Sequence, residues 1–258
     1  MKEQKSSING MAVNYKTIGQ GKPILILHGW GVGSDSWMVV GELLAQNNYW
    51  VIVPDLPGFG KSQEPDKAWE FDDYIRWIEQ FVKEMKLDKF YLVGHSFGGA
   101  LAAKFTVLHP GMVDKLVLCD AAIVRKDRLD WRQTYAKRMA HWKNNLLRLP
   151  FAPRIYPFAK KVLYRFAGNH DYELASPLMK ETFKNIINID LLEYTRNINS
   201  QTLIIWGDKD LSTPVEDAYE IQKAVKNSKL EIIAGAGHKL HRTHSPQLAQ
   251  IINSFLRI

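Results

Sequence analysis

The chain has 258 residues, of which 46% are hydrophobic, a net charge of +7 at neutral pH and one cysteine. This length allows one large domain, or one domain with an insertion, whose core needs no disulfide bonds. A single cysteine excludes an intrachain disulfide, and no apolar run is long enough to span a membrane. Because the first residues contain no apolar core, we predict no signal peptide and a cytoplasmic location.

The predicted elements alternate between short apolar strands and helices. Asn9-Gly10 lies between two alternating runs and predicts a type I′ hairpin turn. Strands are then expected at 23–27, 50–54, 91–93, 116–118, 202–206 and 230–233, and helices at 37–45, 71–85, 98–105, 215–225 and 247–256. Buried strands that alternate with amphipathic helices predict an α/β fold with a mostly parallel central sheet and helices on both faces.

The alternation breaks once, between residues 121 and 196. This stretch is helix-like, rich in aromatic and basic residues, and interrupted by Pro150, Pro153 and Pro157. We interpret it as an inserted helical cap (lid) at residues 123–196, with a core domain formed by residues 1–122 and 197–258. Residues 123–165 contain twelve basic and two acidic side chains, a net charge of +10, so the rest of the chain carries −3.

Ser96 is the candidate nucleophile. It lies in Gly94-His95-Ser96-Phe97-Gly98, a G-x-S-x-G sequence preceded by the apolar run 90–93 and followed by small, helix-forming residues. A strand, a sharp turn and a helix form the context in which this pattern indicates a nucleophile elbow. The two glycines suit the turn because they have no Cβ to clash.

A serine nucleophile needs a base, and the base needs an acid that orients it. His238 follows the last predicted strand and is the candidate base. Asp210, after the strand that ends at Trp206, is the preferred acid, with Asp208 and Asp120 as alternatives. All of these residues follow strands, and open α/β sheets bind ligands at that edge. The order Ser, Asp, His is the one expected with this elbow.

An oxyanion hole needs two main-chain N–H donors. We expect one from Phe97, the residue after the nucleophile, and the other from Trp30 in the loop after the strand that ends at Leu27. Gly29 allows the main chain to approach closely at that point. His28 and His95 flank these positions and are interpreted as packing or hydrogen-bonding residues that do not carry a proton in the reaction.

No cofactor or metal is predicted. The three-residue spacing of His238, His241 and His244 could suggest a metal, but no carboxylate or cysteine nearby completes a ligand set. The spaced glycines at 29, 31 and 33 lack the residues that complete a nucleotide-binding loop. The aromatic residues of the basic cap could also bind single-stranded nucleic acid, but we expect them to pack the cap over the catalytic cleft.

With these motifs the chain resembles the capped, esterase-like enzymes of the α/β hydrolase fold family. The matching segments occur in family order and span nearly the whole chain: 27–31, 54–62, 94–99, 206–210 with Pro214, and 237–238. The resemblance implies the same nucleophile (Ser96), acid (Asp210), base (His238) and oxyanion hole (Trp30 and Phe97). Haloalkane dehalogenases and epoxide hydrolases are disfavoured because they carry Asp in place of this serine. The run 239–244 departs from relatives that often have an acidic residue there.

The expected function is that of a carboxylesterase-like serine hydrolase, which cleaves small esters through an acyl-enzyme without a cofactor. Thioester, lactone, amide or carbon–carbon bond hydrolysis on the same triad are alternatives. A ligand receptor or signalling protein that retains the triad is an alternative of another class. We expect a small-molecule ester as substrate, and the basic cap is compatible with an anionic one. We expect no nucleic-acid or membrane partner. The protein is expected to be a monomer or a homodimer.

Overall fold

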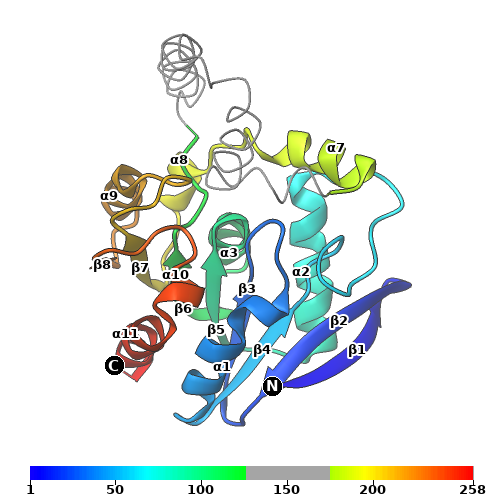
Figure 1. The fold of residues 1–258 in the computed structure, drawn as a ribbon, viewed down its shortest axis with the longest axis horizontal. Coiled ribbons are helices and arrows are strands. Elements are labelled where there is room, and N and C mark those ends of the chain that lie inside the picture. The colour runs from blue at the N-terminus through cyan, green and yellow to red at the C-terminus, as the bar shows by residue number, and fades with distance from the viewer. Residues whose placement is uncertain (126–174, 258) are drawn as a thin grey trace, which may run out of the picture. The chain divides into compact units, whose positions relative to one another are not determined.

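The computed structural model describes residues 1–125 and 175–257. In this part of the chain a central sheet is flanked by helices (Figure 1). Its strands are β1 (Lys2–Ile8), β2 (Met11–Ile18), β3 (Lys22–Leu27), β4 (Tyr49–Pro54), β5 (Phe90–His95), β6 (Val113–Cys119), β7 (Gln201–Gly207) and β8 (Ser228–Ile233). Its helices are η1 (Ser34–Trp37), α1 (Met38–Ala45), α2 (Phe71–Glu84), α3 (Phe97–Leu108), α7 (Pro177–Ile186), α8 (Leu192–Thr195), α9 (Val215–Ala224), α10 (Leu240–Thr243) and α11 (Ser245–Arg257).

The strands of the described residues form one eight-stranded sheet in the order β1-β2-β4-β3-β5-β6-β7-β8. β1 pairs with β2, and β2 with β4, in antiparallel fashion, whereas every pair from β4 to β8 is parallel. The prediction of a mostly parallel sheet is therefore confirmed. Because β5, β6, β7 and β8 are successive neighbours, the loops that follow them meet at one edge of the sheet.

Both faces of the sheet are covered by helices, as Figure 1 shows. Side chains of α1 and α11 pack on one face, and those of α2, α3 and α9 pack on the other. Within β3, Ile24 and Ile26 pack on the face covered by α1 and α11. Leu25 and Leu27 pack on the face covered by α2, α3 and α9. Successive side chains of a strand point to opposite faces, so a strand covered on both sides is apolar throughout.

The hairpin and the helix starts follow local sequence signals. Asn9 and Gly10 join β1 to β2 with φ angles of 50° and 82°, the left-handed conformations that a type I′ turn needs. Helix α2 begins with a capping box, in which the side chains of Glu70 and Asp73 pair with each other's main chain. The predicted hairpin turn is confirmed, and the helix expected at 71–85 is observed at Phe71–Glu84.

Only the two ends of the predicted cap, 123–125 and 175–196, belong to the described residues. The main-chain N–H of Leu191 donates to the carbonyl of Ile123, and the N–H of Trp69 donates to the Thr182 hydroxyl on α7, both at 3.0 Å. The rest of the cap lies outside the described residues, so the helical cap and its boundaries stay predictions. Among the helices that are described, none has the length and apolar character to cross a membrane.

Three histidines, His28, His95 and His241, are buried in the fold. The ring of His241 stacks on Trp37 with 5.1 Å between centroids and lies 4.4 Å from the ring of His95. Burial lowers the pKa of His28, lowers that of His95 well below its usual value, and, together with the charge of Arg242, lowers that of His241 to about 3. All three rings are therefore neutral in the native protein near pH 7.

We predict that the protein loses stability steeply as the pH falls below about 6.5. The unfolded chain takes up protons on these histidines there, whereas the native protein does not until the pH nears the lowered pKa values. Each histidine should lower the free energy of unfolding by on the order of 1 kcal/mol per pH unit. Urea unfolding between pH 4 and pH 7, in the wild type and in His241→Phe, measures this.

The phenylalanine variant keeps a ring against Trp37 but cannot take up a proton. Its stability should therefore fall less steeply with acid than that of the wild type. Equal slopes for the two proteins would show that His241 is not a buried neutral histidine.

Candidate functional site

Ser96 sits in the turn between β5 and α3 with φ 52° and ψ −117°, a conformation that an L-residue adopts only under constraint. Close packing surrounds this turn. A Cβ on Gly98 would lie 2.3 Å from the carbonyl oxygen of Leu27, and a Cβ on Gly94 would lie 2.4 Å from that of Gly98. The predicted nucleophile elbow is thus present, and its glycines are required by the contact between α3 and the neighbouring strands.

The structure brings Ser96, His238 and Asp210 together. His238 Nε2 lies 3.0 Å from Ser96 Oγ, and His238 Nδ1 lies 2.7 Å from Asp210 Oδ2. Ser96 follows β5, Asp210 follows β7 and His238 follows β8, so the parallel strands deliver all three to one edge. The three side chains form an unbroken hydrogen-bonded chain from the hydroxyl to the carboxylate.

Every acceptor position of the Asp210 carboxylate is used. Oδ2 accepts from His238 Nδ1–H and, at 2.6 Å, from the Thr213 hydroxyl, and Oδ1 accepts from the main-chain N–H groups of Ser212 and Thr213 at 2.7 and 3.0 Å. Burial alone would raise the pKa of this carboxyl, but His238 and the Thr213 donors outweigh burial and lower it. Asp210 is therefore a buried carboxylate that keeps its charge.

The two alternative acids lie elsewhere. Asp208 is exposed, and its carboxylate accepts the main-chain N–H of Gly235 at 2.7 Å. Asp120 is buried after β6, and its carboxylate accepts the main-chain N–H of Gly207 at 2.9 Å. Among the described residues, Asp210 is the aspartate hydrogen-bonded to His238. The preference for Asp210 over the other two agrees with this geometry.

The two expected oxyanion-hole donors border Ser96. A Cβ on Gly29 would lie 3.2 Å from the Ser96 Cβ, so the peptide that joins Gly29 to Trp30 passes directly beside Ser96. Phe97 is the first residue of α3, where main-chain N–H groups have no partner within the helix. Within residues 1–125 and 175–257, neither the Trp30 nor the Phe97 N–H is hydrogen-bonded to an acceptor. Both donors are thus available to a ligand.

His28 fixes the orientation of the Trp30 donor. Its Nε2 accepts the main-chain N–H of Leu56 at 2.9 Å, so the ring proton is on Nδ1, which donates to the Gly29 carbonyl at 2.8 Å. A trans peptide is planar, so its N–H points away from its carbonyl. By holding the Gly29 carbonyl, His28 therefore sets the direction of the Trp30 N–H.

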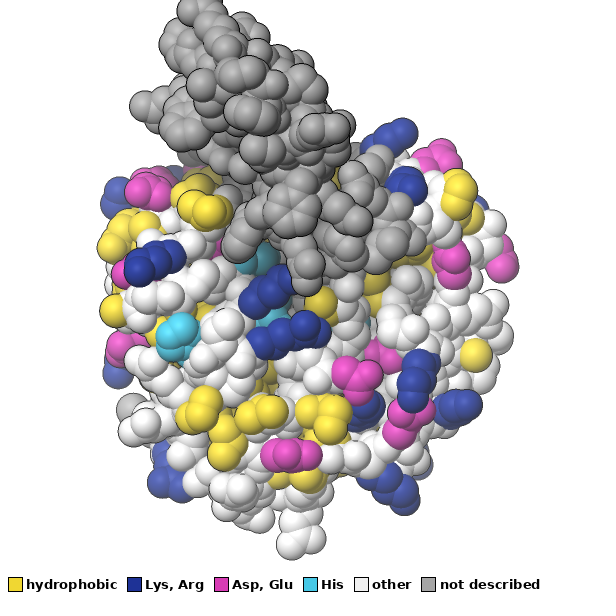
Figure 2. Space-filling model, in the orientation of Figure 1, with side chains coloured by type: hydrophobic (Ala, Val, Ile, Leu, Met, Phe, Trp, Pro, Cys, Tyr) yellow, Lys and Arg dark blue, Asp and Glu magenta, His cyan; other side chains and the backbone are white. Residues whose placement is uncertain are grey.

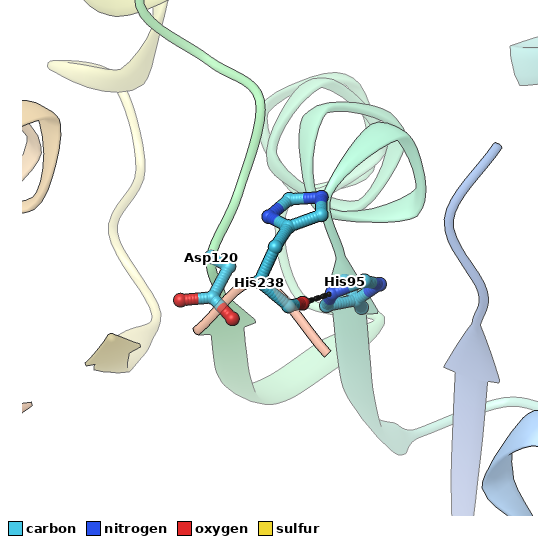
Figure 3. A group of neighbouring side chains, drawn as sticks. All are labelled: His95, Asp120 and His238. Atoms are coloured by element: carbon cyan, nitrogen blue, oxygen red, sulfur yellow. Dashed lines mark hydrogen bonds between the residues drawn. The ribbon is translucent and has the colours of Figure 1, made fainter. Parts of the chain in front are cut away.

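His95 and Asp120 lie close to His238, and Figure 3 shows the three side chains approaching from three different elements. Each offers one potential metal-ligand atom, and these atoms lie within 4.8 Å of one another. However, His238 already bonds Asp210 and Ser96, and His95 Nε2 donates to the His238 carbonyl at 2.7 Å. A cation here would break those hydrogen bonds, so the residues fit a triad better than a metal site, and the absence of a metal stays a prediction.

Sequence reasoning missed the contribution of Thr213. Its hydroxyl and its main-chain N–H both bond Asp210, and the hydroxyl lies 3.3 Å from His238 Nδ1. The signal was present, because an Asp followed three residues later by Thr is a common way to close a turn by side-chain hydrogen bonds. The bonds of His28 and His95 join residues far apart in sequence and have no such local signal.

Comparisons with known proteins support one family. A family model described as the alpha/beta hydrolase fold matches residues 22–245. The 2-hydroxy-6-oxo-6-(2'-aminophenyl)hexa-2,4-dienoic acid hydrolase of Metapseudomonas resinovorans is 30% identical over 265 residues, which cover 98% of this chain and 90% of the relative.

Two solved structures share the fold. A bromoperoxidase from Bacillus anthracis has a TM-score of 0.78 and 25% identity, with all of both chains covered. An esterase from Exiguobacterium antarcticum has a TM-score of 0.76 and 22% identity, with 98% of both chains covered. The sequence motifs, the sheet order, the elbow and the family match lead to one conclusion: this chain belongs to the α/β hydrolase fold family.

Proposed function

We propose that the protein is a cofactor-independent serine hydrolase that cleaves small carboxylic esters through an acyl-enzyme. The observation that carries this proposal is the hydrogen-bonded chain from Ser96 Oγ through His238 to Asp210 Oδ2, with distances of 3.0 and 2.7 Å. A nucleophile, a base and an orienting acid within hydrogen-bond reach are the arrangement that acyl transfer requires.

In the first half-reaction, Ser96 Oγ attacks the ester carbonyl carbon while its proton passes to His238 Nε2. Asp210 holds the imidazole with its proton on Nδ1 and stabilises the imidazolium that forms. The carbonyl oxygen becomes an oxyanion that accepts hydrogen bonds from the Trp30 and Phe97 N–H groups. The bond to the alcohol then breaks, and the proton on Nε2 goes to the leaving alkoxide.

In the second half-reaction, His238 takes a proton from water, and the hydroxide attacks the acyl carbon bound to Ser96 Oγ. The same two N–H groups stabilise the second oxyanion. When this intermediate collapses, His238 returns the proton to Ser96 and the carboxylic acid leaves. Losing one oxyanion donor from such a site typically costs about 3–4 kcal/mol of transition-state stabilisation.

Carbon–carbon bond hydrolysis is the second candidate, because of the relative at 30% identity. The acid in that relative's name contains no ester or amide bond, so its hydrolysis has to break a carbon–carbon bond. Such a substrate must also receive a proton on carbon before its leaving group is stable. Ester cleavage needs no group beyond Ser96, His238, Asp210 and the two N–H donors, so we place it first.

The substrate's charge is a separate proposal. On the face in Figure 2, the Lys and Arg side chains of the described residues are interspersed with Asp and Glu. Residues 123–165 carry a net charge of +10 and the rest of the chain −3, so we propose that this segment attracts anionic substrates. Most of this segment lies outside the described residues. We propose a small ester as the partner, with no nucleic acid or membrane, and a monomer or homodimer in the cytoplasm.

The nucleophile is tested by Ser96→Ala. This variant should lose ester hydrolysis by on the order of 10⁴-fold or more while keeping its fold, because no other group can form the acyl-enzyme. Turnover of p-nitrophenyl acetate, and of a panel with a thioester, a lactone, an amide and a 2-hydroxy-6-oxodienoate, measures this in both proteins.

The substrate panel also separates the functions. Fastest turnover of the oxodienoate would favour carbon–carbon hydrolysis over ester cleavage. No turnover of any compound, together with a stable complex with a ligand or a protein, would favour a receptor that retains the triad. Fluorophosphonate labelling of another residue, with Ser96 unmodified, would remove Ser96 as the nucleophile.

The acid is tested by comparing Asp210→Asn with Asp208→Asn. The first should lower kcat by on the order of 10³–10⁴-fold, because an amide cannot hold the required tautomer of His238. The second should stay within about threefold of the wild type, since Asp208 only closes a turn at the surface. A larger loss in Asp208→Asn, with both variants folded, would reverse the assignment.

The basic segment is tested by salt. For an ester with a remote carboxylate, kcat/KM should fall by about two- to fivefold from low to high salt, because exposed charges are screened. A neutral ester of similar size should change little, and replacing Lys126, Arg128 and Arg132 by Gln should shrink the difference. If both esters respond alike, the segment does not attract the substrate.

A further inference from the structure

Two buried carboxyl groups lie behind His238, and the proposed mechanism uses only one of them. Asp210 follows β7 and Asp120 follows β6, two strands that are parallel neighbours. The Asp210 carboxylate accepts four hydrogen bonds. The Asp120 carboxyl accepts one, from the N–H of Gly207, and its Oδ2 is buried without a partner among the described residues.

Asp120 contacts both ends of the loop that carries Asp210. Its Oδ1 accepts the N–H of Gly207, the last residue of β7, at 2.9 Å. Its main-chain oxygen lies 3.3 Å from the hydroxyl of Thr213, which itself donates to Asp210 at 2.6 Å. Asp120 adopts a φ of 43° at this position, which is uncommon for a residue other than glycine. The start of the loop from 207 to 213 is thus hydrogen-bonded to Asp120 at the end of β6, and its other end contacts the Asp120 main chain at Thr213.

The surroundings of Asp120 do not support a second negative charge. The side chain is fully buried, and no Lys or Arg of the described residues forms an ion pair with it. The Asp210 carboxylate repels a negative charge on Asp120, which raises the pKa of Asp120. One hydrogen bond cannot offset the removal of a carboxylate from water.

We propose that Asp120 is a positioning residue that works as a neutral carboxylic acid, tying the Asp210 loop to β6 without adding a charge beside the triad. The role as a positioning residue rests on the proposed function, because it requires Asp210 to be the catalytic acid. Oδ1 accepts the Gly207 N–H, so the proton is on Oδ2. Burial, followed by the charge of Asp210, raises the pKa of Asp120 to about 9, in agreement with this geometry.

The groups that face Asp120 come from four elements. Asp210 faces it from the loop after β7, His238 from the loop after β8 and His95 from β5, and Cys119 precedes it on β6. Burial raises the pKa of the Cys119 thiol well above its usual value, and burial lowers that of His95 well below. Both are therefore neutral near pH 7. The negative charge that acts on Asp120 is that of the Asp210 carboxylate.

A neutral Asp120 makes a specific prediction for stability. The unfolded chain loses this proton near pH 4, whereas the native protein keeps it until about pH 9. The native state therefore binds one more proton between these values, and stability falls as the pH rises through that window. Above about pH 9 the native protein also loses this proton, so Asp120 causes no further loss of stability as the pH rises.

Asp120→Asn tests this directly, because the amide has the shape of the protonated acid but cannot ionise. Urea unfolding of both proteins should give a ratio of unfolding constants that changes about tenfold per pH unit from pH 5 to pH 8, with the variant becoming relatively more stable. Asp208→Asn, at an exposed aspartate, should show no such trend. A ratio that is independent of pH would overturn the proposal.

A second measurement does not depend on any variant folding. Carbon NMR of the wild type, labelled at its aspartate side-chain carboxyl carbons, should show one carboxyl that titrates near pH 9. If every aspartate titrates below pH 6, Asp120 is ionised and the proposal is wrong.

The positioning role is tested by the rate of Ser96 labelling with a fluorophosphonate, which needs no knowledge of the substrate. At pH 7, Asp120→Asn should label within about threefold of the wild type, and Asp120→Ala, which leaves the Gly207 N–H without its acceptor, about tenfold more slowly. Equal rates for the two variants would contradict the role. If the wild type is not labelled at all, the proposed function is contradicted, and the positioning role with it. In that case urea unfolding as a function of pH and carbon NMR still decide whether Asp120 is neutral.

Discussion

The turn at Ser96 is the constraint on which the rest of the site depends. The serine can point out of the sheet edge only because its main chain adopts φ 52°, and that conformation is held by the contact of α3 with β3. At Gly98 this contact leaves no room for even a methyl group beside the carbonyl of Leu27. The strain is local, and the core holds it in place because the residues of β5 and α3 next to Ser96, from Leu92 to His95 and from Phe97 to Ala103, are buried.

With Ser96 placed there, strand order brings His238 and Asp210 to it. β5, β6, β7 and β8 are neighbours in the sheet, so residues more than a hundred positions apart in the chain meet at one edge. The loops are then joined by buried hydrogen bonds. His95 holds the carbonyl of His238, His28 holds that of Gly29, and Thr213 holds the carboxylate of Asp210. Each bond orients a group that the proposed mechanism uses, and each is buried or partly buried, where loss of a partner is costly.

The sequence predicted the order of strands and helices in the core, and the candidate nucleophile and base, because those signals are local. The hairpin at Asn9-Gly10, the buried strands and the elbow at Ser96 follow from turn chemistry, apolar runs and glycine placement. The choice among the aspartates could not be made in the same way. Asp210 and Asp120 both follow apolar strands, and they differ in how many donors surround each carboxyl, which depends on contacts formed only in the folded chain.

The central claim is that Ser96 carries the acyl group of the substrate during turnover. The most direct test is to mix the enzyme with excess p-nitrophenyl acetate, quench with acid within milliseconds and analyse the digested protein by mass spectrometry. The account predicts an acetyl adduct on the peptide that contains Ser96, and its disappearance as the substrate is exhausted. An ester that is hydrolysed with an adduct on another residue, or with none on Ser96 at any time, would contradict it.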